Sequence, residues 1–177
     1  MKFENIIKNY ITYNKPCKQC ELDWFSRQSI KSAIEHAATA EILWKGRCIR
    51  HSHQRRVKAE VLTKVRDQLL VKINYIKQCK KFDQLLSFIK EFGRSIYGLG
   101  DLYIYDTALR IGAKLQLYPD QFYLHAGTRK GAKKLGIDVG KKTTRNVSDL
   151  PEKLCTVLRK FKVYEVEGLL CIYKDCF

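Results

Sequence analysis

The amino-acid sequence predicts an all-α fold, a compact bundle of about seven or eight helices that forms a single α-helical domain over residues 1–177. Three observations favour this fold class. Apolar residues recur mainly at the i, i+3, i+4, i+7 spacing of amphipathic helices. Only three prolines and ten glycines occur, which is few for a loop-rich β-sandwich. Hydrophobic residues make up 45% of the chain, enough to build a core without disulfides or metals.

The first predicted helix covers residues 2–12, where Phe3, Ile6 and Tyr10 belong to one apolar stripe. Asn14 and Pro16 are predicted to end this helix, because proline fits poorly in a helix interior. We expect a short irregular segment to follow, and it contains both cysteines of a Cys-x-x-Cys sequence.

The second predicted helix starts after a serine cap, at Ser26 or Ser29, and runs to about Trp44. The stretch from there to residue 56 combines a glycine and four arginines with His51 and His53. It is typical of a solvated loop, but arginine also suits phosphate contacts and the histidines suit metal binding or proton transfer. Phosphate contact is the favoured functional interpretation.

A long helix is predicted from Gln54 to Ile76, because aliphatic residues recur there at near-heptad spacing, and Ser52 is its expected N-cap. A turn over residues 77–81 separates it from a helix that begins near Asp83 and continues past Phe92.

A Gly98-Leu99-Gly100 turn follows, and a further helix is predicted from Asp101 to about Leu115. Glycine accepts the left-handed backbone of such a turn and lets another backbone approach closely. The free N–H groups that open the next helix can hold an anion. This pattern resembles the helix-hairpin-helix motif, in which a Gly-hydrophobic-Gly turn grips a DNA backbone, and it covers about residues 83–117 as the centre of the bundle.

The order of the following segments resembles the DNA glycosylase superfamily built around that hairpin, over about 40 of the 177 residues. Tyr118-Pro119-Asp120 leads through Leu124–Arg129 into a basic helix that ends in Leu135-Gly136. The family implies a catalytic aspartate and, in lyase-type members, a lysine after the turn. The sequence departs at both places, since Asp101 to Tyr103 follow the turn and His125 stands where the aspartate is expected.

The last part of the chain contains a short apolar run over residues 122–124, which is either a strand or the start of a helix. Thr128 is expected to cap the basic helix, whose two glycines suit close approach to a nucleic-acid backbone. A basic connector over residues 140–146 leads to predicted helices over about residues 148–161 and 163–173.

The charge of the chain indicates what kind of partner it binds. Lys and Arg outnumber Asp and Glu 34 to 18, a formal net charge of +16, which favours nucleic acid, either DNA or RNA, as the first candidate partner and an anionic membrane surface as the second. The leading hypothesis is a nucleic-acid-binding protein that grips the phosphate backbone, with Tyr97, Tyr103 or Tyr105 stacking on a base. Its candidate contacts are Arg94, Gly98, Leu99, Gly100, Thr128, Arg129, Lys130 and Lys133, with Arg55 and Arg56 as a second patch.

Two alternatives stay open. One is an enzyme acting on nucleic acid, either a diverged glycosylase or a nuclease, with His125 and Asp106 as catalytic acid/base groups. Asp106 and Arg110 are spaced i, i+4, so a simple ion pair is the other expectation for them. The second alternative is a protein-interaction module whose basic face meets an acidic protein.

The remaining expectations concern cofactors and location. Cys17 and Cys20 have zinc-knuckle spacing, but no second tight cysteine pair accompanies them, so ordinary thiols are expected and no metal or cofactor is predicted. No stretch has the length of a membrane span and the N-terminus does not resemble a signal peptide. A cytoplasmic protein that does not bind membranes is therefore predicted.

Overall fold

The structure is a computed structural model that describes residues 2–44, 47–51, 54–94, 96 and 98–177. These residues are mainly α-helical, with two small antiparallel strand pairs, which confirms the all-α fold class. The chain divides into two compact units: Met1–Lys18 with Pro119–Phe177 form unit 1, and Gln19–Tyr118 form unit 2. No composition change in the sequence marks this division.

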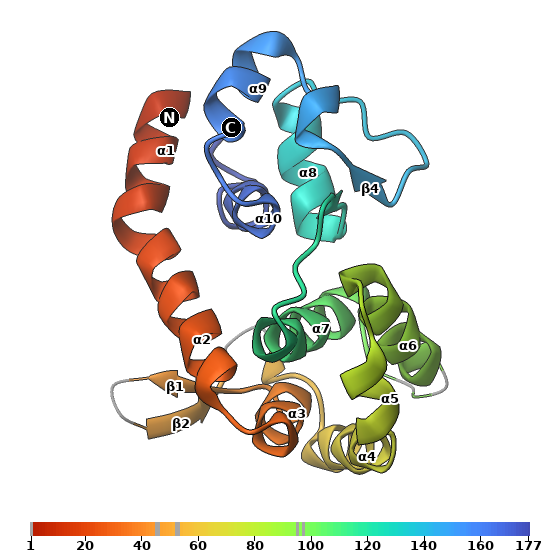
Figure 1. The fold of residues 1–177 in the computed structure, drawn as a ribbon. Coiled ribbons are helices and arrows are strands. Elements are labelled where there is room, and N and C mark those ends of the chain that lie inside the picture. The colour runs from red at the N-terminus through yellow and green to blue at the C-terminus, as the bar shows by residue number, and fades with distance from the viewer. Residues whose placement is uncertain (1, 45–46, 52–53, 95, 97) are drawn as a thin grey trace. The chain divides into compact units, whose positions relative to one another are not determined.

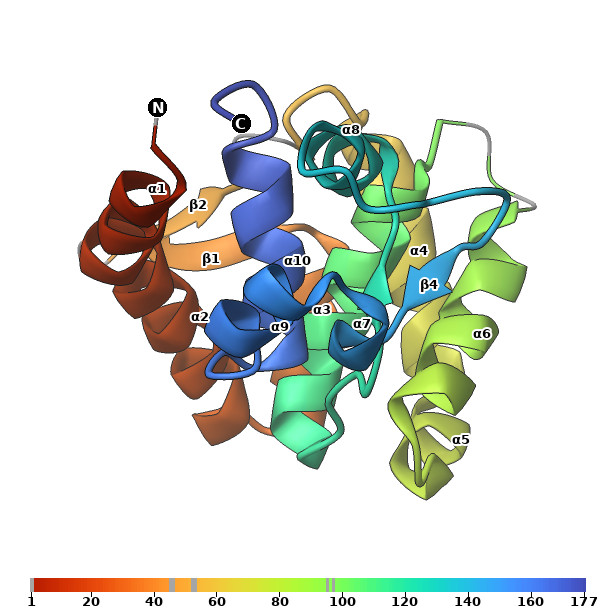
Figure 2. The ribbon, with the colours of Figure 1, turned by 90° about the horizontal axis from the view of Figure 1, so that it is seen from above.

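The N-terminal helix continues through the residues that were expected to end it (Figures 1 and 2). Helix α1, Phe3–Asn9, passes through a π-helical turn over Tyr10–Asn14 into α2, Lys15–Arg27. The predictions that the helix ends at Asn14 and Pro16 and that an irregular segment follows are therefore wrong. The Lys15 N–H bonds to the Tyr10 carbonyl five residues back, so the hydrogen-bond register shifts just before Pro16. The proline then occupies the first turn of α2, where its missing N–H costs little.

In unit 2, the predicted cap at Ser29 is confirmed, because its Oγ accepts the Ser32 N–H at 3.1 Å. The helix it begins, α3, covers Ile30–Ala38 and does not reach Trp44. Ala40 turns the chain with a φ of +59°, and strand β1, Glu41–Trp44, pairs antiparallel with β2, Arg47–Arg50. Bulky apolar residues in both segments fit this short hairpin better than a further helical turn.

The expected long helix of unit 2 is two helices, α4 (Ala59–Val71) and α5 (Ile73–Gln78), interrupted at Lys72 with φ −100° and ψ 16°. It begins later than predicted, and the expected cap at Ser52 lies outside the described residues. Helix α6 covers Phe82–Arg94 and α7 covers Asp101–Leu115, as the sequence predicts. Helix α7 is buried from Tyr103 to Ala113 and packs against α3 and α6, so it is the central helix of unit 2.

Unit 1 is built on α8, Ala126–Lys134, and α10, Val163–Ile172, which lie side by side (Figure 1). The apolar run over residues 122–124 was expected to be either a strand or the start of a helix. Its first two residues form strand β3, Phe122–Tyr123, which pairs with β4, Thr144–Arg145. Helix α9 covers Glu152–Leu158 after a 3₁₀ turn over residues 147–149. The core of this unit includes Ile6, Tyr10, Phe122, Leu158, Val166, Leu169 and Leu170.

Two glycines of α8 allow its close packing on α10. A Cβ added to Gly131 would overlap the carbonyl oxygen of Leu170 and lie 3.0 Å from its carbonyl carbon. A Cβ added to Gly127 would lie 2.7 Å from the Sγ of Cys171. These glycines therefore accommodate a neighbouring helix, and the expectation that they serve approach to a nucleic-acid backbone is not needed to explain them.

Candidate nucleic-acid interface

The Gly98–Gly100 turn is exposed and open. Gly98 has a φ of +96°, which favours glycine, whereas Gly100 has an extended backbone with φ −93° that any residue adopts. Apart from each glycine's own chain neighbours, no atom of the residues that the structure describes lies within 4 Å of the position that a Cβ would take at either glycine. The described part of the chain therefore does not fill the space beside these two glycines.

Gly100 is the N-cap of α7, and it brings no side-chain acceptor to the first turn of that helix. The Ile104 N–H bonds to the Gly100 carbonyl at 3.2 Å, while the N–H groups before it are those that every uncapped helix leaves available. Asp101 is exposed in this turn and complements the helix dipole. The same carboxylate opposes an approaching phosphate, so the turn combines features for and against anion binding.

Four candidates near the turn have different outcomes. Arg94 is the last residue of α6, but its side chain, like all of Tyr97, lies outside the described part of the structure. Tyr103 is 3% exposed and its hydroxyl donates to the Ala38 carbonyl at 2.6 Å. Tyr105 is fully buried. Neither Tyr103 nor Tyr105 presents a ring face to a base, so the expectation that they stack is wrong.

Asp106 is bound in a buried polar network of unit 2. Its Oδ2 accepts from the Gln54 Nε2 at 3.0 Å, and the Gln54 Oε1 accepts from the Arg110 Nη1 at 3.0 Å. The Arg110 Nε donates to the Glu21 Oε1 at 2.7 Å. The Gln54 side-chain amide therefore bridges Asp106 and Arg110, which were expected to pair with each other directly. No sequence pattern indicated Gln54 or Glu21 as members of this network, because both lie far from α7 in the sequence.

The electrostatics of this network keep Arg110 charged although it is fully buried. Burial alone would lower the pKa of Arg110, but the carboxylates of Glu21 and Asp106 outweigh that effect and raise it. The Asp106 carboxylate thus balances a buried cation, which accounts for its position without a catalytic role.

His125, the other catalytic candidate, is the N-cap of α8, a position that was expected for Thr128. Its half-buried ring stacks on Tyr123 with centroids 6.3 Å apart. His125 belongs to unit 1 and Asp106 to unit 2. His53, proposed with His51 as a metal or proton handler, lies outside the described residues.

Most of the candidate contact residues on α8 form hydrogen bonds or ion pairs within unit 1. Thr128 is fully buried and donates to the Glu167 Oε1 at 2.8 Å, so it does not face solvent. Arg129 donates to three backbone carbonyls, and Lys130 pairs with Asp175 at 2.5 Å. Lys133 is exposed, as are Arg55 and Arg56 of unit 2.

Cys17 and Cys20 are exposed on α2, and among the described residues no group of three or more His, Cys, Asp or Glu side chains is placed to hold a metal ion. Within the same residues, no helix has both the length and the apolar character needed to cross a membrane.

Comparison with known protein families, with curated proteins and with solved structures finds no match.

Proposed function

We propose that this protein binds nucleic acid through the phosphate backbone, with the Gly98–Gly100 turn as a principal contact. The observation that carries the proposal is the open space beside both glycines at an N-terminus of α7 that lacks a side-chain cap. Phosphate oxygens accept hydrogen bonds from such N–H groups, and among the described residues nothing lies within 4 Å of a Cβ position at either glycine.

Charge supports the same proposal. Unit 1 contains 16 basic and 8 acidic residues, and unit 2 contains 18 and 10, so each unit contributes +8 of the net charge of +16. A surface of this sign attracts phosphates over a long range and binds them with little dependence on base sequence. Arg55 and Arg56, both exposed in unit 2, are further candidate contacts.

The test is fluorescence anisotropy with labelled duplex and single-stranded DNA and RNA across a salt series, with Gly100→Asp beside the wild type. Aspartate is among the best N-cap residues, so α7 keeps its stability or gains some. Its carboxylate occupies the N–H groups that a phosphate would use. We expect affinity at low salt to fall about tenfold, and the log–log salt slope for duplex DNA to drop by about 0.9 for the lost phosphate contact.

Asn5→Asp is the matched control, because Asn5 is exposed in the first turn of α1 and the substitution changes the charge by the same amount. Equal losses in Gly100→Asp and Asn5→Asp would mean that the turn has no special role. Binding to no strand type, with the wild type folded, would refute nucleic-acid binding itself.

A further inference from the structure

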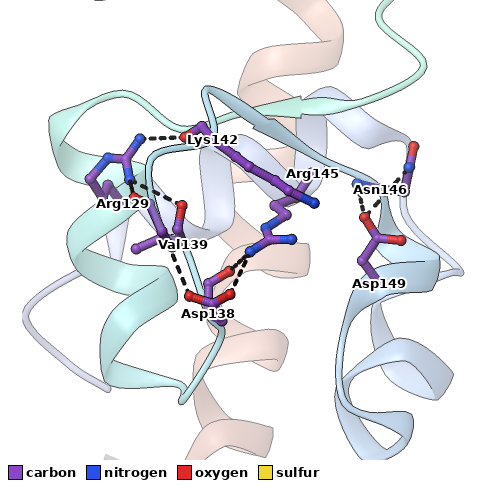
Figure 3. A network of polar contacts seen from close by, with 8 residues as sticks. Arg129, Asp138, Val139, Lys142, Arg145, Asn146 and Asp149 are labelled. Atoms are coloured by element: carbon purple, nitrogen blue, oxygen red, sulfur yellow. Dashed lines mark hydrogen bonds and ion pairs between the residues drawn. The ribbon is translucent and has the colours of Figure 1, made fainter.

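The side chain of Arg129 organises the loop that follows α8 (Figure 3). Its Nη1 donates to the carbonyls of Val139 at 3.3 Å and Gly140 at 2.9 Å, and its Nη2 donates to the carbonyl of Lys142 at 2.5 Å. Three carbonyls within four residues therefore point at one guanidinium. The planar fork of arginine suits this arrangement, since it presents several donors in fixed directions.

The N–H groups of the same peptide bonds point the other way. In a trans peptide the N–H and C=O groups are antiparallel, and no cis peptide bond occurs among the described residues. The N–H groups of Gly140, Lys141 and Thr143 are therefore directed away from Arg129. Asp138 Oδ1 accepts the first of these at 3.0 Å, while those of Lys141 and Thr143 have no acceptor among the described residues.

The charges around these N–H groups are favourable for an anion. Lys141, Lys142 and Thr143 are all exposed. The nearby acid, Asp138, is paired with a cation, because its Oδ2 accepts from the Arg145 Nη2 at 3.0 Å, and its Oδ1 accepts from the Gly140 N–H (Figure 3). Gly140 has a φ of +40°, and left-handed residues of this kind help to form the concave groups of N–H donors that bind anions.

We infer that residues 140–143 form a phosphate-binding loop, a second anion site in unit 1 that is separate from the hairpin turn of unit 2. The N–H groups of Lys141 and Thr143 and the ammonium groups of Lys141 and Lys142 bind the phosphate oxygens. Arg129 is a positioning residue: it fixes the carbonyls on the inner side of the loop and does not itself touch the phosphate. This role differs from the direct phosphate contact expected for it from the sequence.

The ligand chemistry, a phosphate oxyanion, has two sources, a nucleic-acid backbone or a free phosphorylated compound. The test is two-dimensional ¹H–¹⁵N NMR of the full chain, titrated separately with inorganic pyrophosphate and with a short DNA duplex. We expect saturable shifts of the Lys141 and Thr143 amide signals with pyrophosphate. The same shifts with the duplex would identify a nucleic-acid backbone as the ligand, and their restriction to pyrophosphate would identify a free phosphate compound.

Two variants test the mechanism. Arg129→Lys keeps the charge but loses the planar guanidinium, and we expect pyrophosphate affinity to fall about fivefold, whereas Lys134→Arg, at an exposed position of the same helix, leaves it unchanged. The double variant Lys141→Ala/Lys142→Ala alters only exposed side chains and is expected to weaken binding about tenfold.

The inference would be overturned by amide signals of Lys141 and Thr143 that move with neither ligand, by wild-type affinity in Arg129→Lys, or by wild-type affinity in the double variant. The amide signals of Leu99 and Asp101 report the hairpin turn in the same spectra. Failure of this loop and failure of the proposed nucleic-acid contact are therefore distinguished in one titration.

Discussion

The packing of α8 on α10 predicts that Gly131→Ala destabilises the protein. Alanine is favoured over glycine in a helix interior by about 1 kcal/mol, so propensity alone predicts a gain. The added Cβ would overlap the carbonyl oxygen of Leu170, which is a backbone atom and cannot rotate away. Overpacking of this kind costs up to about 3 kcal/mol. The net expectation is a loss of about 2 kcal/mol of unfolding free energy, or about 4–8 °C in Tm for a chain of this size.

The matched control is Gly93→Ala in α6, another buried helical glycine. Its added Cβ would lie 2.7 Å from the Cδ1 of Ile104, the flexible end of a side chain that can change rotamer. The gain in helix propensity then offsets most of the cost, so we expect a change within about 1 kcal/mol of wild type. Urea unfolding followed by far-UV circular dichroism measures both variants. Wild-type stability in Gly131→Ala, or equal losses in the two variants, would refute the close contact of α8 and α10.

Two further predictions concern unit 2. Glu21→Ala leaves the fully buried Arg110 without its closest carboxylate and is expected to cost about 3–5 kcal/mol in urea unfolding, and a cost under about 1 kcal/mol would contradict the ion pair. Burial raises the pKa of Tyr103 from 10.0 to about 12, so the folded state holds this proton more tightly than the unfolded state. Its contribution to stability is therefore complete below pH 10 and is lost as the pH rises from 10 to 12. Tyr103→Phe should make the fall in unfolding free energy over that range shallower, and equal slopes in variant and wild type would contradict the assigned pKa.

Local sequence signals predicted the elements that depend on local chemistry. The cap at Ser29 and the bounds of α7 follow from side-chain capping, apolar periodicity and the glycines before Asp101, all of which act over a few residues. The π-helical turn was missed because the effect of Pro16 on a helix depends on the hydrogen-bond register that precedes it. The β1–β2 hairpin was missed because each strand has only four residues, too few to separate from a helix end by periodicity.

The polar network around Arg110 shows why the site was harder to predict than the fold. The i, i+4 spacing correctly places Asp106 and Arg110 on one side of α7, but it says nothing of a third side chain between them. Gln54 precedes Asp106 by 52 residues, and Glu21 precedes Arg110 by 89. Contacts over such separations depend on tertiary packing, which a single sequence does not encode in any local pattern.

The glycines also show that tertiary packing separates residues with similar sequence contexts, and here the difference bears on function. The sequence presents two pairs, at 98 and 100 and at 127 and 131, and both suit close approach by a phosphate backbone. The structure separates them, because the second pair contacts the backbone or side chains of α10, whereas no described residue fills the space beside the first pair. A glycine whose missing side chain is replaced by another part of the same chain is explained by packing. Of the two pairs, the first leaves its steric freedom unused by the described part of the chain, and for that reason Gly100, and not Gly131, is the residue at which a change should alter binding without lowering stability.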